Sequence, residues 1–383
     1  MRSSIALTLA FVVALAGCAS PTTKRVDVTS QQTDVEARKQ MDLLAEDMVA
    51  ERTRLHRVHW KLVSHSAELC PKRIQAAGVD VMALPKGELA ASYSRLFGIK
   101  DEPTVLSVVP DGPADRAGIK AGDVLVSMWG LPISEYNVEV IQERARNVKA
   151  RVVMPVQVRR DGQTLDLTVE PVVSCDYPAI LSPQQVLNAF ADGERIFITR
   201  GMMAFARTDD ELALVVGHEL AHNTMRHIDA KKSNATAGMV GDIALAILSR
   251  GAYRGSSISN AAAQAYSQEF EAEADYVGLY MLANSGYSVQ DAPKFWRRMA
   301  SANPSNIKGT HTASHPPTSY RMVALEEAAR EIEGKRATSA SLVPLRKDGK
   351  PFVAGEGLLP GTQATPNDTA NCMLGTDGQC MRR

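Results

Sequence analysis

Apolar residues recur at helical spacing along the stretch from Val35 to about Val63. The positions that form this stripe are Met41, Leu44, Met48, Leu55, Val58 and Leu62. A period of three to four residues predicts one amphipathic helix. We expect this helix to pack on the C-terminal part of the chain, with His56, His59 and His65 at the surface or facing a partner rather than binding a metal.

Two further helices are predicted in the second half of the chain. Thr208 and Glu211 have the Thr-x-x-Glu spacing of a capping box, which marks the start of a helix. The apolar face that follows consists of Leu212, Val215, Val216 and Leu220. An Ala-rich helical stretch then runs from about Asn260 to Asn284, and Gly286 ends it.

The middle of the chain has the pattern of a small β-rich domain. Short apolar runs alternate with turn residues there. Asp161-Gly162 predicts a two-residue hairpin turn between the strands 156–159 and 165–169.

Length and charge limit the possible classes. The chain has 383 residues, enough for two domains with real cores. The predicted segments are a targeting peptide (1–17), a linker (18–34), a helical region (35–89), a β-rich domain (90–173), a helical domain (174–334) and a disordered tail (335–383). Lys plus Arg and Asp plus Glu both number 43, so no net charge attracts nucleic acid or an anionic membrane.

The N-terminus has the features of an export signal. Met1-Arg2 precedes the apolar run 5–16, which is too short to span a bilayer comfortably. The run ends in Leu-Ala-Gly-Cys, which resembles a bacterial lipobox and implies that Cys18 becomes the lipidated first residue. The residue Ser20, shortly after the cysteine, is not the Asp that is associated with retention in the inner membrane, so the outer membrane is favoured. The alternative is an ordinary cleaved secretory peptide.

Four cysteines remain after Cys18, an even number that suits an oxidising compartment. Cys70 and Cys175 flank the β-rich domain, and Cys372 and Cys380 lie close together in the tail. Three connectivities are possible, and we favour Cys70–Cys175 with Cys372–Cys380.

The most specific chemical signal is the run His218-Glu219-Leu220-Ala221-His222. Residues four apart lie on one face of a helix, so both imidazoles can bind one metal ion with Glu219 beside them. This is the His-Glu-x-x-His pattern of zinc hydrolases. The alternative is two surface histidines on an ordinary helix.

A third ligand is expected from the acidic run 269–275. Glu271 and Asp275 are four apart, so Glu271 can bind zinc while Asp275 accepts a hydrogen bond from a ligand imidazole. Glu273 competes as a ligand but has no Asp four residues later. Taken alone, the run favours a solvated acidic face, and its position after the His-Glu-x-x-His motif favours the metal ligand instead.

Two other features accompany these motifs. Asn188–Ala191 and Ile196–Thr199 have the pattern of a short hairpin, and Ser314-His315-Pro316-Pro317 is followed by Arg321. With them, the stretch from about Ser182 to Glu333 resembles the zinc metallopeptidase family M48, which includes HtpX and the CAAX prenyl endopeptidases.

The resemblance implies an α+β fold with a mainly helical, gluzincin-type protease domain and a small β-hairpin. It also implies one Zn²⁺ per chain, held by His218, His222 and Glu271, with Glu219 as general base on a water. His315 would stabilise the oxyanion or cap the zinc at rest, and Arg321 would assist. A turn residue before proline is the other interpretation of His315.

The β-rich domain resembles a PDZ domain. Leu96-Phe97-Gly98-Ile99 resembles the carboxylate-binding loop, and Ala117-Gly118-Ile119 and Gly122-Asp123-Val124-Leu125 follow in the bacterial PDZ order. PDZ domains bind an extended peptide by adding it to a sheet as a strand. The alternative is a structural spacer whose groove is blocked.

Together these features predict a periplasmic zinc endopeptidase that is anchored to the bacterial outer membrane by lipid only. Its expected substrates are proteins of the cell envelope, in quality control. The alternative is an envelope chaperone or assembly factor with a mostly latent protease site. The sequence leaves the oligomeric state, the cleavage preference and the natural substrate open.

Overall fold

The computed structural model describes residues 23–134, 136–147, 153–233, 257–302 and 319–355, with side chains from 268 onward in the fourth range. It also describes the backbone of β12 (Met373–Leu374) and β13 (Cys380–Met381), which pair antiparallel. The chain divides into two compact units, Met1–Gln40 and Met41–Arg383. The contacts discussed below lie within the second unit.

The long N-terminal helix α1 spans Ser30–His65 and so begins before the predicted start at Val35. Its second half carries the predicted apolar face, because Leu55, Val58 and Leu62 are buried in the main core. Met41, Leu44 and Met48 are only partly buried. The short 3₁₀ helix η1 (Ala67–Leu69) follows directly.

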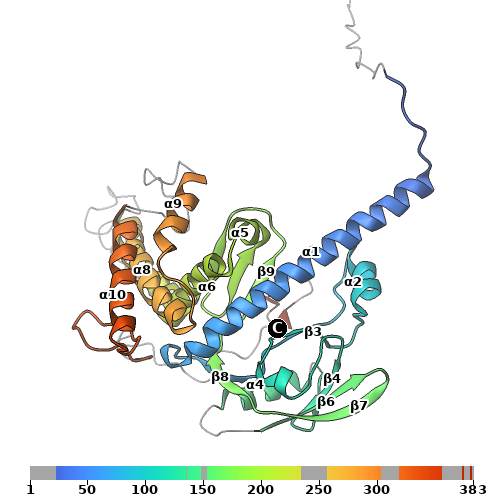
Figure 1. Cartoon of the computed structure of the whole chain (residues 1–383), viewed down its shortest axis with the longest axis horizontal. Coiled ribbons are helices and arrows are strands. Elements are labelled where there is room, and N and C mark those ends of the chain that lie inside the picture. Colours follow the sequence, from blue (N-terminus) through green and yellow to red (C-terminus); the bar gives the residue numbers. More distant parts are fainter. Residues whose placement is uncertain are drawn as a thin grey trace, which may run out of the picture. The chain divides into compact units, whose positions relative to one another are not determined.

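The middle sheet lies beside α1 (Figure 1). Its strand order is β2-β3-β4-β6-β7, with β5 paired to β4. These strands are β2 (Val79–Met82), β3 (Thr104–Val108), β4 (Val124–Met128), β5 (Leu131–Pro132), β6 (Met154–Arg160) and β7 (Gln163–Val169). The helices between them are α2 (Ala90–Phe97), α3 (Pro113–Arg116) and α4 (Val138–Arg146). Because β2 belongs to this sheet, the β-rich region begins before residue 90.

The hairpin between β6 and β7 turns at Asp161-Gly162, as the sequence predicts. Both residues have positive φ, 49° and 79°, which is the backbone of a type I′ turn. The segment expected to be the carboxylate-binding loop differs. Leu96 and Phe97 form the last turn of α2, and Gly98 caps it with φ 66°. Ile99 is buried in a small cluster with Ala45 of α1, so this stretch ends a helix and packs on α1.

A two-stranded stem carries the middle sheet. Strand β1 (Arg73–Ala76) pairs antiparallel with β8 (Val172–Cys175), from Arg73 opposite Cys175 to Ala76 opposite Val172. A disulfide joins Cys70 to Cys175 at the base of this stem. The chain therefore enters and leaves the β-rich region at one place.

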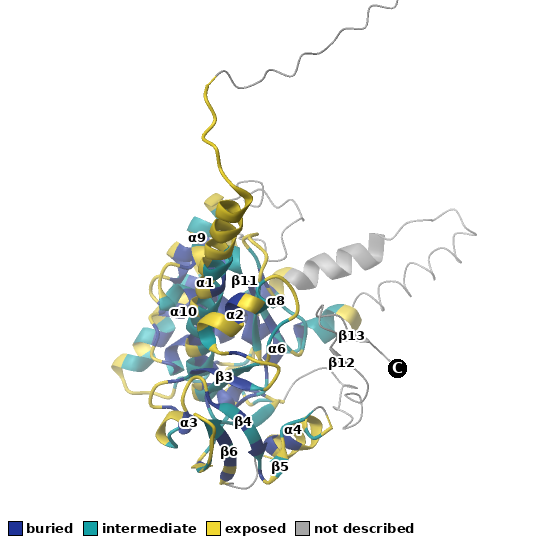
Figure 2. Cartoon of the chain, turned by 90° about the vertical axis from the view of Figure 1, so that its right-hand side faces the viewer, coloured by how far each residue is buried: buried dark blue, intermediate teal, exposed yellow. Residues whose placement is uncertain are grey.

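The C-terminal region combines a three-stranded sheet with a set of helices. The sheet order is β10-β11-β9, with β10 (Ala189–Ala191) antiparallel and β9 (Ala179–Ser182) parallel to β11 (Ile196–Thr199). The helices are α5 (Arg200–Phe205), α6 (Asp209–Thr224), α8 (Ser257–Asn284), α9 (Ala292–Ala302) and α10 (Ser319–Ala337). Figure 2 shows the dark blue buried residues gathered around α6 and α8, where the main core lies.

Residues 338–355 differ from the expected disordered tail. Leu342 and Phe352 pack on the main core, and Leu345 pairs with Pro351 in an isolated bridge. These apolar side chains, which lie within a mostly polar stretch, explain why the ordered part of the chain continues past residue 337. Among the described residues, no helix combines the length and apolar character needed to cross a membrane.

Candidate metal centre

Helix α6 presents the His-Glu-x-x-His residues, and its start is fixed by the predicted capping box. The Thr208 hydroxyl accepts a hydrogen bond from the Glu211 backbone N–H at 3.2 Å. The Glu211 carboxylate in turn accepts one from the Arg207 backbone N–H at 2.7 Å. From Leu212 onward every residue of the helix is buried, so His218, Glu219 and His222 lie inside the core.

Two imidazoles and one carboxylate converge at a single point. The Nε2 atoms of His218 and His222 are 3.2 Å apart. Glu271, from α8, places one carboxylate oxygen 3.2 Å from His218 Nε2 and the other 3.4 Å from His222 Nε2. Two nitrogens bound to one tetrahedral zinc at 2.0–2.1 Å lie about 3.3 Å apart. The three side chains therefore have the spacing of ligands around one ion.

Two glycines allow α6 and α8 to approach closely next to this point. A Cβ atom at Gly278 would lie 3.1 Å from the carbonyl carbon and oxygen of Gly217. A Cβ atom at Gly217 would lie 2.6 Å from the Leu282 side chain. Gly217 directly precedes His218, so the absence of side chains at this crossing sets the distance between His218 and Glu271.

The His218 ring is held by a buried ion pair. Its Nδ1 lies 3.0 Å from the Asp275 carboxylate, which also binds Arg321 through two hydrogen bonds of 2.7 and 2.8 Å. Burial opposes the charged form of Asp275, but Arg321 and His218 outweigh it and lower the Asp275 pKa. The Trp296 ring of α9 packs edge-on against His218 and beneath the Arg321 guanidinium.

The His222 ring is held by a different pair of residues. Its Nδ1 faces Nδ1 of the buried His227 at 2.9 Å, and His227 Nε2 lies 2.9 Å from the Glu273 carboxylate. If His222 binds a metal through Nε2, its Nδ1 carries the proton and donates it to His227. His227 then donates its Nε2–H to Glu273. The His227 ring also stacks on Phe270 at 4.7 Å.

The charge of this cluster suits a divalent cation. Glu219, Glu271, Asp275 and Arg321 are all buried, so three carboxylates and one guanidinium leave two negative charges. Lys231, one-third exposed, approaches Glu271 at 3.9 Å. Burial would lower the pKa of His218, but Asp275 and Glu271 raise it to about 9. The same carboxylates that favour a proton there favour a metal cation, so the donor set fits one Zn²⁺.

The structure gives several predicted residues a defined place. Arg321 lies behind the ligands, with its guanidinium on Asp275 and 3.5 Å from the Glu271 carboxylate. At this position the guanidinium contacts both the carboxylate that faces His218 and the carboxylate of Glu271. Glu273 points to His227, away from the convergence point. Cys18, His315 and Cys372 lie outside the described residues, as does the side chain of Cys380.

Three supporting residues could not be recognised from the sequence pattern. His227, Trp296 and Gly278 have no motif of their own, although a third histidine five residues after His222 is a signal that can be noticed. Asn223 also has a local role, because its side-chain oxygen accepts from the Gly193 N–H at 2.8 Å and its amide donates to the Arg195 carbonyl at 3.0 Å. Asn223 thereby connects the β10–β11 hairpin to the end of α6, which we call the metal helix because it carries His218 and His222.

Comparison with known families agrees with this geometry. The model of peptidase family M48 matches residues 169–329, which contain every residue of the convergence point. Over these residues the chain is similar to peptidase family M48. The model of the PDZ domain matches residues 89–170, which hold every strand of the middle sheet except β2.

Two curated relatives match parts of this chain. The mitochondrial metalloendopeptidase OMA1 of Schizosaccharomyces pombe is 31% identical over 157 residues, which are 40% of this chain and 46% of that protein. The putative beta-barrel assembly-enhancing protease of Vibrio cholerae is 34% identical over 129 residues, 30% of this chain and 26% of that protein. The chain thus spans less than half the length of either relative.

Among solved structures, the HtrA-type protease AlgW with decapeptide matches with 26% identity and a TM-score of 0.22. The match covers 26% of this chain and 30% of that one.

Proposed function

We propose that the chain is a zinc-dependent endopeptidase whose metal ligands are His218, His222 and Glu271. The convergence of two Nε2 atoms and one buried carboxylate within 3.2–3.4 Å of one another carries this proposal. Two His and one Glu leave a fourth position open, which is typical of catalytic zinc sites. The similarity of residues 169–329 to peptidase family M48 supports it independently.

In this proposal the chain's own residues carry out the proton transfers. A zinc ion at the site would polarise the substrate carbonyl and lower the pKa of a water. Glu219 accepts the proton of that water as its oxygen adds to the peptide carbonyl. Glu219 then gives the proton to the departing amine, so that the C–N bond breaks and the carboxylate side leaves. Asp275 and His227 hold the two imidazoles in orientation throughout.

An edge strand near the site suits an extended substrate. Strand β10 ends the sheet order β10-β11-β9, and it lies against α6. Its Phe190 is partly exposed and stacks on Phe197 at 4.7 Å. A polypeptide that adds to β10 would pass the metal helix with its backbone extended, which is the usual way for strand addition to present a peptide.

Metal analysis of single variants tests the ligand set. Purified protein should contain about one zinc per chain, and His218→Ala or Glu271→Ala should lose it together with casein cleavage. Glu273→Ala is the matched control on the same helix. It should keep the metal with an affinity lowered about tenfold, since it acts only through His227. Normal zinc content in Glu271→Ala with loss in Glu273→Ala would show that the ligand is Glu273.

We further propose that the protein is a lipoprotein of the outer membrane that faces the periplasm and acts on envelope proteins. The lipobox at Cys18 supports the anchor, and the relatives named beta-barrel assembly-enhancing proteases support the class of substrate. Cys18→Ser should abolish labelling by a radioactive fatty acid and either block processing or release the protein from the membrane. Mature wild-type protein that starts elsewhere and carries no lipid would contradict the anchor.

A further inference from the structure

Helix α1 lies along the open edge of the PDZ sheet. Strand β2 is the last in the sheet order, and among the described strands it pairs only with β3. Arg52 of α1 donates two hydrogen bonds of 2.6 Å to the Asp80 carboxylate and one of 3.1 Å to the Val81 carbonyl. Asp80 and Val81 both belong to β2, so an arginine of α1 binds the strand and one of its backbone acceptors.

Two more residues of α1 continue this contact. The His56 ring lies 3.0 Å from the Ser107 hydroxyl of β3. The Trp60 ring covers Gly78 in the turn that leads into β2, where a Cβ atom would lie 3.3 Å from the indole. Gly78 also has φ +76°, so both the backbone and the indole require glycine there.

Arg52, His56 and Trp60 are spaced by four residues and so lie on one face of α1. We call them the α1 stripe. The helix runs antiparallel to β2, because Arg52 contacts Val81 near the end of the strand and Trp60 contacts Gly78 just before its start. An extended peptide that adds to β2 needs this same edge. Helix α1 therefore stands where a PDZ ligand would lie.

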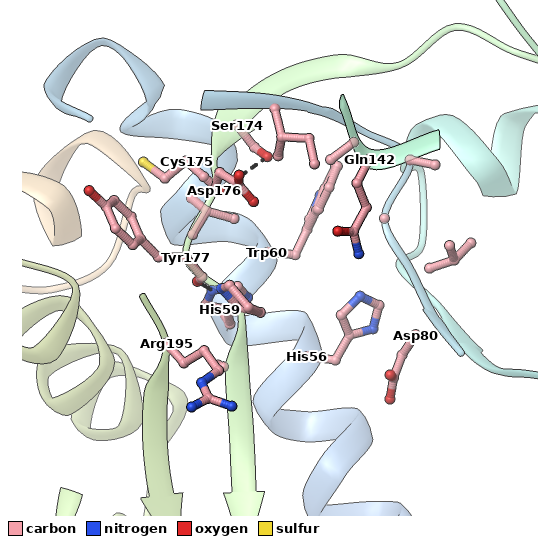
Figure 3. A pocket seen from close by; sticks show the side chains of 18 of the residues that line it. His56, His59, Trp60, Asp80, Gln142, Ser174, Cys175, Asp176, Tyr177 and Arg195 are labelled. Carbon is pink, nitrogen blue, oxygen red and sulfur yellow. Dashed lines mark hydrogen bonds between the residues drawn. The ribbon is translucent and has the colours of Figure 1, made fainter. Parts of the chain in front are cut away.

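A cavity remains beside the stripe. It has a volume of about 490 Å³, within the range of ligand sites. Figure 3 shows His56 and Trp60 on the side of α1 that faces Asp80 and Gln142 across it. The apolar part of its wall includes Trp60 and Val63 of α1, Ile74 of β1, and Ala77 and Val79 at the start of β2. Gln142 belongs to α4, so α1, the start of β2 and α4 form one side of the cavity. The β1–β8 stem, residues 176–179 and the pair Glu194 and Arg195 form the rest of its wall.

The opposite side of α1 holds the start of the metal helix. Arg54 and Arg57 bind the two oxygens of the Asp209 carboxylate at 2.9 and 2.8 Å. Arg54 also donates to the Ala206 carbonyl at 2.9 Å. Asp209 is the first residue of α6, so α1 contacts the PDZ edge with one face and the first turn of the metal helix with another.

We propose that the α1 stripe is a built-in competitor for the peptide site of the PDZ domain. The site takes an extended polypeptide that adds to β2 and places an apolar side chain against the part of the cavity that Val79 and α4 line, and it opens when α1 leaves the strand. A covered site lowers the apparent affinity for a ligand by the fraction of molecules that are open. Because α1 also holds Asp209, occupation of the PDZ site is transmitted to the start of α6. This inference concerns peptide binding and holds whether or not the metal site hydrolyses peptides.

The test measures peptide binding by the full chain. The probes are fluorescein-labelled decapeptides that end in Val, Leu, Phe or Trp, each with a free or an amidated C-terminus. Trp60→Ala and Arg52→Ala should bind the best probe about tenfold more tightly than the wild type, because they remove the competitor. Lys39→Ala is the matched control on α1, since it loses an exposed ion pair with Glu36 but no contact with β2 or with Asp209, and its affinity should equal that of the wild type.

A second measurement uses the unaltered protein. Adding the best probe should increase amide hydrogen exchange in residues 52–60 of wild-type α1, because the helix leaves the strand as the peptide binds. Unchanged or slower exchange there would show that the peptide binds without displacing α1. Equal affinities in all variants, or no peptide binding by any of them, would equally overturn the proposal.

Discussion

Glu219→Gln should reduce the turnover of casein about 10²–10⁴-fold while leaving one zinc per chain in place. The amide has the shape of the carboxylate but cannot accept the proton of the attacking water. The ligand atoms of His218, His222 and Glu271 stay at their present spacing, so metal binding is unchanged. Initial rates at saturating casein and metal analysis of the same sample give both values.

The control for this substitution is Glu269→Gln. Glu269 is the first residue of the acidic run 269–275, but its side chain is 69% exposed and pairs with Lys347 at 3.7 Å. The same chemical change there should alter neither activity nor zinc content. If Glu219→Gln kept wild-type turnover, another group would be the general base. Loss of zinc in that variant would mean that Glu219 helps to hold the metal.

Removal of the Cys70–Cys175 disulfide should lower the free energy of unfolding more than any other substitution proposed here. The two cysteines are 105 residues apart, and closing a loop of that length contributes up to about 4.7 kcal/mol by restricting the unfolded chain. Native strain subtracts from that figure. Both residues are buried in the main core, so the Cys70→Ser/Cys175→Ser variant also places two hydroxyls there.

Thermal unfolding with and without a reductant measures this effect. The melting temperature of the double variant should be clearly below that of the wild type. A reductant should lower the melting temperature of the wild type toward that of the double variant. Cys372→Ser/Cys380→Ser is the matched control, because those cysteines are only eight positions apart in the tail. A double variant at 70 and 175 that melts like the wild type would show that the bridge adds nothing to stability.

The metal centre was largely predictable because its motifs are local. A capping box fixes where α6 begins, and the helical repeat then places His218 and His222 on one face. Glu271 and Asp275 follow the same repeat on α8. The link from His222 through His227 to Glu273 was not predictable, because it joins residues from two helices and depends on how those helices pack.

The PDZ region shows the opposite case. Leu-Phe-Gly-Ile at 96–99 fits a carboxylate-binding loop, but a glycine with positive φ after an apolar turn is equally the end of a helix. The structure has the helix end. The turn that does lead into the edge strand, at Gly78, has no distinctive sequence, and its contact with Trp60 arises only in the folded chain. In our proposal this contact covers the edge to which a peptide would add, which relates it to the blocked groove that the sequence left open as an alternative.

The β1–β8 stem has a consequence for how such a chain can change over time. Ala76 and Val172 sit opposite each other in the ladder, so about a hundred residues are inserted between two neighbouring backbone positions. A genetic deletion that joins these positions through a tight turn would leave the ladder and the bridge below it intact. The segment between these two positions is thus a single insertion into the rest of the chain. Its removal would uncover Ala45, Arg52 and Trp60 of α1, so this face of the helix would have to change as well.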